Sequence, residues 1–346
     1  MIPVFDGHND ALMETYLPEG DGRSLADRLS KGHFDLPRAR EGGFSGGMFA
    51  IFVPPSHATK TAHGTFRKME EILAAPVEPA HAARMAERGI DALAALERAS
   101  GGTLALARSV EEIRGHMASG VISAVLHFEG AEPIAPDLSN LDDFYAAGLR
   151  SLGIVWSRPN AFGHGVDFRF PGTPDTGPGL TGAGKALVRR CNRMGILLDL
   201  SHLNERGFDD VAALSRAPLV ASHSCIHALC PVSRNLTDRQ LAAIRASGGI
   251  VGINFATAFL RGDGREDPDT PLSELVRHIR YAVDRMGEDH VGLGSDFDGT
   301  LVPREIGDVT GLKRIVSALR EAGFDEGAIR KIAHGNWLRV LEETWG

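Results

Sequence analysis

GAGKALVRRCNRMGILLDLSH, residues 182–202, contains one unit of a pattern that recurs along the chain. Residues 182–194 have a helical pattern, and the apolar, β-prone run 196–200 follows directly. The run leads into a serine and a histidine, Ser201 and His202. A polar group just beyond a short buried strand is typical of parallel α/β proteins, which collect functional groups at the carboxyl ends of their strands.

Short apolar runs and helical patterns alternate along almost the whole sequence. We expect eight strands, at residues 2–6, 46–53, 121–128, 149–156, 196–200, 219–222, 249–255 and 290–295. We expect helices at residues 64–75, 80–99, 109–118, 141–147, 182–194, 204–214, 238–246, 272–286, 311–321 and 325–344. Eight such units favour a closed (β/α)8 barrel of the TIM type over an open sheet. Because no composition shift divides the chain, we predict one barrel domain over residues 1–346.

Long loops are expected after strands 2, 4 and 7. The second connection is the longest, the Gly/Pro-rich residues 157–181 follow strand 4, and residues 256–271 follow strand 7. Loops of this length inside a compact domain are usually functional. We therefore predict that they cover a substrate at the barrel mouth.

Composition narrows the choice of partners and compartment. A net charge of −8 and a sequence pI near 6.0 give no electrostatic case for nucleic acid or an anionic membrane. Three cysteines without disulfide or zinc-finger spacing predict reduced thiols. We see neither a signal-peptide pattern nor the ~20 apolar residues that span a bilayer. The expectation is a soluble, cytoplasmic protein.

Five side chains of metal-binding type follow four of the apolar runs. His8 and Asp10 follow the first, Glu129 the third, His202 the fifth and His223 the sixth. In a barrel these positions meet at one mouth. Imidazole and carboxylate groups suit Zn²⁺, and the two oxygens of a glutamate can bridge two cations. Jointly the five residues predict a two-metal site.

Four of the five ligand candidates also have an ordinary structural explanation. His8 can cap a turn, Glu129 can be an ion-paired carboxylate at the barrel rim, and the other two histidines can be satisfied rim residues. His127 shares strand parity with Glu129 and is the competing ligand, which we interpret as inward-facing structure. Asp296, after the last strand, is predicted to face the barrel axis as a general acid or base. His164, in the Gly-rich loop, is a candidate substrate contact.

The combination of these motifs resembles the membrane (renal) dipeptidase family of zinc metallopeptidases, including its soluble bacterial members. The matching segments run nearly end to end: Asp6-Gly-His8-Asn-Asp10, Phe34-Asp-Leu-Pro-Arg-Ala-Arg-Glu-Gly-Gly, Phe128-Glu129-Gly130, Asp199-Leu-Ser-His202, Ser222-His223-Ser224, Ser233-Arg234-Asn235-Leu-Thr-Asp, Gly294-Ser-Asp296-Phe-Asp-Gly and Gly335-Asn336. The resemblance implies a distorted β/α barrel with two zinc ions per chain, and commonly a homodimer.

The resemblance also implies the residue roles. His8 and Asp10 would hold one zinc ion, His202 and His223 the other, and Glu129 would bridge them. A hydroxide between the metals would attack the peptide carbonyl of a dipeptide.

Two further residues complete that implied mechanism. Asp296 would move the proton from the nucleophile to the leaving amine, and Arg234 would bind the free α-carboxylate. The family tolerates a D-residue on the carboxyl side, so dipeptides of the L-Xaa-D-Xaa type are expected substrates. Some members also hydrolyse β-lactams, a possible further activity.

One departure from the family pattern concerns the polarisation of the substrate carbonyl. Trp156 aligns with a position where some members carry a histidine for that purpose. Either Asn160 or His164 takes over this role, or the metals act alone.

Two alternatives remain. The first is another amidohydrolase-type reaction on a cyclic amide, lactone or ester, although such enzymes commonly bridge their metals with a lysine rather than a glutamate. The second is a non-catalytic metal-binding homologue. Loss of Arg234 should cripple a dipeptidase but spare a hydrolase of neutral esters, and a binding protein should be indifferent to the loss of Asp296.

Overall fold

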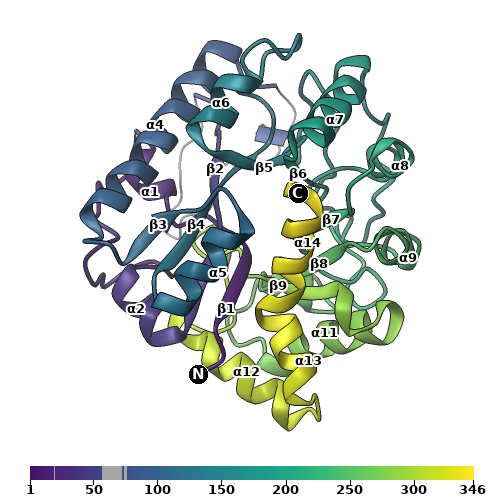
Figure 1. Ribbon diagram of the computed structural model, residues 1–346. Helices are drawn as coiled ribbons and strands as arrows, with labels where there is room; N and C mark the ends of the chain where they lie inside the picture. The colour runs from purple at the N-terminus through teal and green to yellow at the C-terminus, as the bar shows by residue number, and fades with distance from the viewer. Residues whose placement is uncertain (19, 57–71, 74–75) are drawn as a thin grey trace.

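Eight parallel strands close into a barrel in the computed structural model of the protein (Figure 1). The structure describes residues 1–18, 20–56, 72–73 and 76–346. The barrel strands are β1 (Val4–Asn9), β2 (Phe44–Phe52), β4 (Ile122–Glu129), β5 (Leu149–Gly153), β6 (Leu197–Asp199), β7 (Val220–Ser224), β8 (Ile250–Asn254) and β9 (Val291–Gly294). Pairing of β1 with β9 and of β2 with β4 completes the ring. The predicted (β/α)8 barrel is confirmed.

A ninth strand, β3 (Leu104–Leu106), was not predicted. It pairs with the first residues of β4, from Leu104 opposite Ile122 to Leu106 opposite Ala124. On β4, pairing with β5 begins only at Leu126. The short strand therefore covers the part of β4 that β5 does not reach, and a run of three residues is too short to give a clear periodicity.

Helices surround the barrel (Figure 1). Those that match predicted helices are α4 (Pro79–Ala99), α5 (Val110–Ser119), α6 (Leu141–Ala147), α7 (Gly182–Met194), α8 (Glu205–Leu214), α9 (Asp238–Ala246), α11 (Leu272–Met286) and α12 (Leu312–Glu321). The helix expected at 64–75 falls largely outside the described residues. The short elements that the sequence pattern did not predict are α1 (Met13–Tyr16), α2 (Leu36–Gly42), α10 (Thr257–Leu260), and the 3₁₀ turns η1 (Glu288–His290) and η2 (Val309–Gly311).

The helix predicted at 325–344 is divided into three parts. They are α13 (Glu326–Arg330), a π-helical turn η3 (Lys331–Gly335) and α14 (Asn336–Trp345). In Figure 1, α14 crosses in front of the barrel strands.

Trp337 of α14 fills the amino-terminal end of the barrel. The Trp337 indole Nε1 donates to the carbonyl of Leu293 at 3.0 Å. A Cβ atom added at Gly7, Gly252 or Gly292 would lie 2.3, 3.0 or 2.6 Å from the indole. These three glycines therefore make room for the ring, and the opposite, carboxyl-terminal end of the barrel remains for the functional groups.

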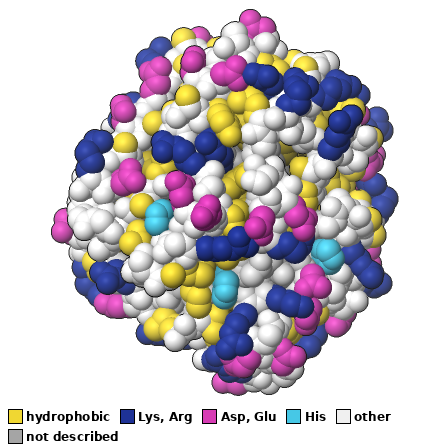
Figure 2. Space-filling view, in the orientation of Figure 1, with side chains coloured by type: hydrophobic (Ala, Val, Ile, Leu, Met, Phe, Trp, Pro, Cys, Tyr) yellow, Lys and Arg dark blue, Asp and Glu magenta, His cyan; other side chains and the backbone are white. Residues whose placement is uncertain are grey.

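Two of the predicted long loops are fully described. Residues 154–181 follow β5 and residues 255–271 follow β8. The connection after β2 includes most of the residues that the structure does not describe. None of the described helices is both long and apolar enough to cross a membrane. Positive and negative side chains are mixed over the face seen in Figure 2.

Candidate active site

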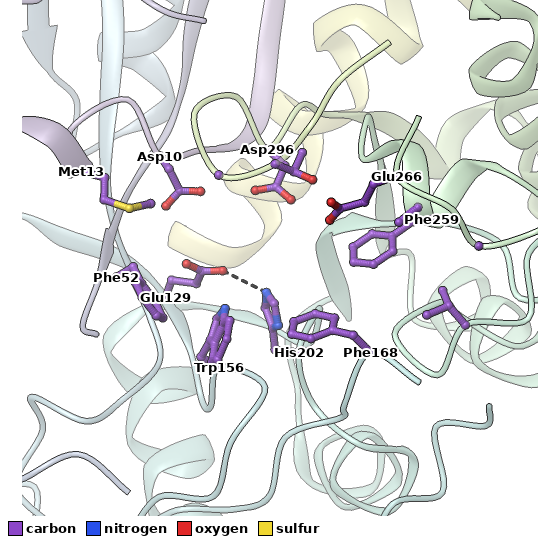
Figure 3. Close-up of a pocket in the computed structure, with 15 residues that line it drawn as sticks. Asp10, Met13, Phe52, Glu129, Trp156, Phe168, His202, Phe259, Glu266 and Asp296 are labelled. Atoms are coloured by element: carbon purple, nitrogen blue, oxygen red, sulfur yellow. Dashed lines mark ion pairs between the residues drawn. The ribbon is translucent and has the colours of Figure 1, made fainter. Parts of the chain in front are cut away.

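A cavity of about 420 Å³ opens at the carboxyl ends of the strands (Figure 3). Its lining includes Asp10, Glu129, His202 and Asp296, each at or just beyond a strand end. The loop after β5 adds Trp156 and Phe168, and the loop after β8 adds Ala258, Phe259, Gly264 and Glu266. Both described long loops therefore line the cavity.

The five predicted metal ligands converge on one carboxylate. Glu129 Oε1 lies 2.9 Å from His202 Nε2, 3.6 Å from His223 Nε2 and 3.8 Å from His8 Nε2. His8 Nε2 is also 3.5 Å from Asp10 Oδ2. Two groups of ligand atoms result, one with His8 and Asp10 and one with His202 and His223, and both include Glu129.

Irregular strand pairing surrounds two of these histidines. The register between β1 and β2 shifts between Asp6 and Asn9, the interval that contains His8. The register between β7 and β8 shifts between Ala221 and Ser224, around His223. Such irregularities redirect side chains beside functional sites. The two imidazole rings stack with their centroids 3.8 Å apart.

Buried ligand atoms in this cluster lack partners within the described structure. Both ring nitrogens of His8 and Oδ1 of Asp10 are buried without a hydrogen bond. Leaving such groups unsatisfied is costly, about 1–3 kcal/mol for each. Bound cations would satisfy the ligand atoms that face the carboxylates, so these residues fit a metal centre.

The charges of the cluster point the same way. Burial opposes a charge on His8, but the carboxylates of Glu129, Asp10 and Asp296 outweigh it and raise the His8 pKa to about 10, so a proton on His8 offsets their charge until a metal ion replaces it. Burial raises the pKa of Glu129 well above its usual value, and the charge of Asp10 adds to this effect. Burial also lowers the pKa of His223 well below its usual value, which favours the neutral ring that a metal requires. Bound cations would neutralise the closely spaced, buried carboxylates of Glu129, Asp10 and Asp296.

Hydrogen bonds orient His223. Ser222 Oγ donates to Asp199 Oδ2 at 2.5 Å and lies 2.7 Å from His223 Nδ1. Because its one proton goes to the carboxylate, the serine oxygen accepts from Nδ1–H of the histidine. The lone pair of His223 Nε2 is then free to face Glu129 and a metal.

His202 has two neighbours at its Nδ1. Ser157 Oγ lies 2.7 Å from this nitrogen, and Arg234 Nε donates to it at 3.3 Å. When Nε2 binds a metal, Nδ1 carries the ring proton and donates it to the closer serine, and this nitrogen then no longer accepts from Arg234.

His127 lies beside the cluster but away from Glu129. Its Nδ1 is 2.8 Å from Ser151 Oγ, and its Nε2 is 3.8 Å from Asp199 Oδ2. Its ring meets that of His8 edge-on, with centroids 5.4 Å apart. His127 therefore faces inward and packs against a candidate ligand, in a third group with His8 and Asp199.

Asp296 faces the same cavity. Its left-handed backbone (φ 58°) is held by a hydrogen bond from its N–H to the carbonyl of His8, and Asn254 Nδ2 donates to its carboxylate at 2.9 Å. Burial, with the charge of Asp10, raises the Asp296 pKa to about 6. A Cβ at Gly299 would lie 2.2 Å from Asp10 Oδ2 and 2.5 Å from Asp296 Oδ1, so this glycine lets the turn approach both carboxylates.

Arg234 is buried behind the cavity. Its Nη1 donates to Ser224 Oγ at 2.7 Å and its Nη2 to the carbonyl of His223 at 2.9 Å. The guanidinium lies 5.8 Å from the ring centroid of Phe259, which lines the cavity. Burial lowers the Arg234 pKa to about 10, so the side chain is cationic at neutral pH. These two hydrogen bonds and the one to His202 use three of its five N–H groups, and one group on each of Nη1 and Nη2 has no partner within the described structure. Arg234 itself is not among the described residues that line the cavity.

Asn160 and His164 lie elsewhere in the loop after β5. Asn160 Nδ2 donates to the carbonyl of Ile154 at 2.9 Å, and its Oδ1 accepts from the N–H groups of Phe162 and Gly163. These bonds shape the loop. The described residues that line the cavity include Trp156 but neither Asn160 nor His164.

Several residues of the site were missed by sequence reasoning. Asp199 and Ser222 lie in the quoted motifs, but their contact depends on the pairing of β6 with β7. An aromatic wall, defined here as Phe52, Trp156, Phe168 and Phe259, has successive ring centroids 5.0, 5.7 and 6.1 Å apart. Glu266 also lines the cavity, and its sequence context of alternating charges carries no signal for such a role.

Comparison with known proteins agrees with this geometry. The family model for membrane dipeptidases, peptidase family M19, matches residues 1–345. The chain belongs to the M19 membrane dipeptidase family. It is therefore a member of a family of metallo-dipeptidases.

Three similar proteins illustrate the relationship. A Rhodobacter sphaeroides metallopeptidase, solved with a phosphinate mimic of the dipeptide L-Ala-D-Ala, is 51% identical, with 99% of each chain covered and a TM-score of 0.90. The M19 metallopeptidase described as dipeptidase AC is 50% identical, with 100% of this chain and 99% of that chain covered and a TM-score of 0.89. An uncharacterised Klebsiella pneumoniae protein in the pqqA 5′ region is 52% identical over 246 residues, covering 71% of this chain and 91% of its own length.

Proposed function

We propose that this M19 member is a binuclear zinc dipeptidase whose substrates include L-Xaa-D-Xaa dipeptides. The observation that carries the proposal is the pair of buried ligand groups that share Glu129. The R. sphaeroides relative that binds a mimic of L-Ala-D-Ala supports the substrate class. The nearly complete coverage of both chains makes that relative a fair guide to the cavity.

The residues divide between metal binding and proton transfer. His8 and Asp10 would hold one zinc ion, His202 and His223 the second, and Glu129 both. When bound, two zinc ions lower the pKa of water and stabilise negative charge that develops on the carbonyl oxygen. Asp296 would take a proton from the attacking water and return it to the nitrogen of the leaving amine. By the family resemblance, Trp156 would take the position at which some members carry a polarising histidine. Its ring lies 5.7 Å from the His202 ring, centroid to centroid.

The experiment compares L-Xaa-L-Xaa and L-Xaa-D-Xaa dipeptides on zinc-reconstituted and chelator-treated protein. We expect cleavage that requires metal, accepts a D-residue at the carboxyl position and coincides with about two bound zinc ions per chain. Absence of turnover by protein that carries two zinc ions would reject the dipeptidase. Cleavage of esters, lactones or blocked amides by that protein would then favour the alternative amidohydrolase-type reaction.

Arg234 provides a second test that separates these reactions. A guanidinium is suited to the free carboxylate of a dipeptide. In the wild type, conversion of that carboxylate to an amide should lower kcat/KM by about tenfold or more, the scale of a charged hydrogen bond. The Arg234→Lys variant should show a smaller ratio between acid and amide. A purely structural role of Arg234 would lower both rates and leave their ratio unchanged.

The predictions of a homodimer and of a cytoplasmic location are independent of this chemistry. Sedimentation equilibrium of the zinc-reconstituted protein tests the first, and fractionation of cells of the source organism tests the second.

A further inference from the structure

Glu266 is a carboxylate of the cavity that neither metal group includes. It lies in the loop after β8, is exposed, and lines the cavity together with Phe259 and Asp296. Figure 3 shows its carboxylate directed into the space beside those two side chains. Within the described structure Glu266 has no hydrogen bond or ion pair.

A nearby cation of the same loop, Arg261, forms ion pairs with carboxylates other than Glu266. Arg261 Nη2 lies 2.5 Å from Asp263 Oδ2, and Arg261 Nη1 lies 3.4 Å from Asp267 Oδ2. Arg261 is therefore held by two other carboxylates. The negative charge of Glu266 is left to act on whatever enters the cavity.

Aromatic side chains near Glu266 add a second feature that favours cations. The faces of Phe168 and Phe259 are stacked with an interplanar angle of 13° and belong to the aromatic wall. Aromatic faces attract ammonium and guanidinium groups, and a carboxylate at the same pocket adds a direct charge partner. Neither feature favours an acidic side chain.

The position of Arg234 indicates which part of a substrate Glu266 meets. The Arg234 guanidinium lies against Phe259, and Phe259 lines the cavity with Glu266. If Arg234 binds the substrate carboxylate, as the proposed function requires, the carboxyl-terminal residue lies on this side. The other end of the aromatic wall, at Phe52 and Trp156, is then left for the amino-terminal residue.

We infer that Glu266 is a specificity-determining residue that favours dipeptides with a cationic side chain, lysine or arginine, at the carboxyl-terminal position. This inference rests on the proposed dipeptidase function. The cationic side chain of the substrate is remote from the scissile bond. Its interaction with Glu266 would therefore stabilise the bound substrate and the transition state equally, and its effect should appear mainly in KM.

The test measures kcat and KM for L-Ala-Xaa with Xaa as lysine, norleucine or glutamate, in the configuration that the enzyme cleaves. Lysine and norleucine differ only in the ammonium group. The wild type should prefer lysine over norleucine by roughly three- to tenfold, the scale of a partly exposed charge contact with an aromatic contribution. Glu266→Gln should remove that preference, and Glu266→Lys should invert it in favour of glutamate.

A matched variant, Asp263→Asn, removes an equal charge from the same loop at a residue outside the described lining of the cavity. It should keep the preference for lysine. Metal-dependent cleavage of all three peptides with equal KM would overturn the inference and leave the dipeptidase intact. Equal losses of preference in the Glu266→Gln and Asp263→Asn variants would also overturn it. They would show that the preference comes from the total negative charge of the loop and not from a direct contact between Glu266 and the substrate. Failure to cleave any dipeptide would reject both proposals.

Discussion

At the scale of single residues, the site depends on groups that hold the ligands as much as on the ligands. Ser222 connects Asp199 to His223, and Asn254 holds Asp296. Such partners fix the tautomer of a histidine and the direction of a carboxylate.

Replacement of Asp296 with asparagine should separate catalysis from metal binding. The change keeps the shape of the side chain and removes its ability to accept a proton, so kcat should fall by about a hundredfold or more. Asp296 also lies within ligand distance of His8 and His223, but the zinc content of the variant should stay near that of the wild type because the two groups that share Glu129 keep all their ligands. Steady-state kinetics with metal analysis measures both, and an unchanged kcat would remove Asp296 from the proposed mechanism.

The Ser222→Ala variant should weaken metal binding at the His202 and His223 side. Loss of the hydroxyl leaves His223 Nδ1 without its acceptor, and such losses typically cost about ten- to a hundredfold in metal affinity. Competition with a chromophoric chelator measures the affinity. Ser123→Ala is a matched control, because Ser123 is a buried strand serine bonded to His116, outside the metal groups. Equal affinities in the two variants would contradict the role given to Ser222.

At the scale of elements, the two ends of the barrel have different roles: α14 packs against one end, and the candidate metal ligands lie at the other. Trp337 enters from α14 at the amino-terminal end, where Gly7, Gly252 and Gly292 leave space for it. The ligands occupy the other end of the same strands. Stability and chemistry are thus placed on different residues, as is usual in this type of barrel.

Truncation of Trp337 should therefore affect stability without a direct effect on catalysis. The ring is fully buried, and Trp337→Ala should lower the free energy of unfolding by about 3–5 kcal/mol. Trp345→Ala, at the partly exposed end of the same helix, should cost less. Denaturant unfolding of zinc-loaded protein measures the difference, and activity per folded molecule should remain near the wild-type value. A larger loss from Trp345→Ala would contradict this account of the barrel end.

At the scale of the whole molecule, the barrel brings ligands from distant parts of the sequence to one place. His8 and His223 are separated by more than half of the chain, yet their rings stack. The result is a buried concentration of like charges that only the folded chain assembles. Metal binding and folding should therefore be coupled.

Removal of zinc should lower the stability of the protein. A ligand at a free concentration about a hundredfold above its Kd stabilises the folded state by about 2.7 kcal/mol. We expect the melting temperature to fall on chelation and to recover with zinc. Glu129→Gln should lose most of this response, whereas Glu205→Gln, at an exposed ion pair with Arg239, should keep it. A melting temperature of Glu129→Gln that still responds fully to zinc would contradict the bridging role.

Much of the fold and the candidate ligand set could be predicted from the sequence. The apolar runs that precede Glu129, His202 and His223 are local signals, because a buried parallel strand is apolar along its length whatever it packs against. Their alternation with helical patterns predicts a barrel, and a barrel brings strand ends together. The convergence of the five ligand candidates follows from those local signals.

Other features were decided only by the tertiary structure. Strand β3, the contact of Ser222 with Asp199, and the course of the loop that keeps Asn160 and His164 out of the cavity lining all depend on neighbours distant in sequence. The same holds for the aromatic wall. Phe52 comes from β2, Trp156 and Phe168 come from the loop after β5, and Phe259 comes from α10. The position at which a strand ends can be predicted from the local sequence, because it depends on a short run of apolar residues. Contacts between side chains of distant segments form only when the chain folds, so no local sequence pattern predicts them.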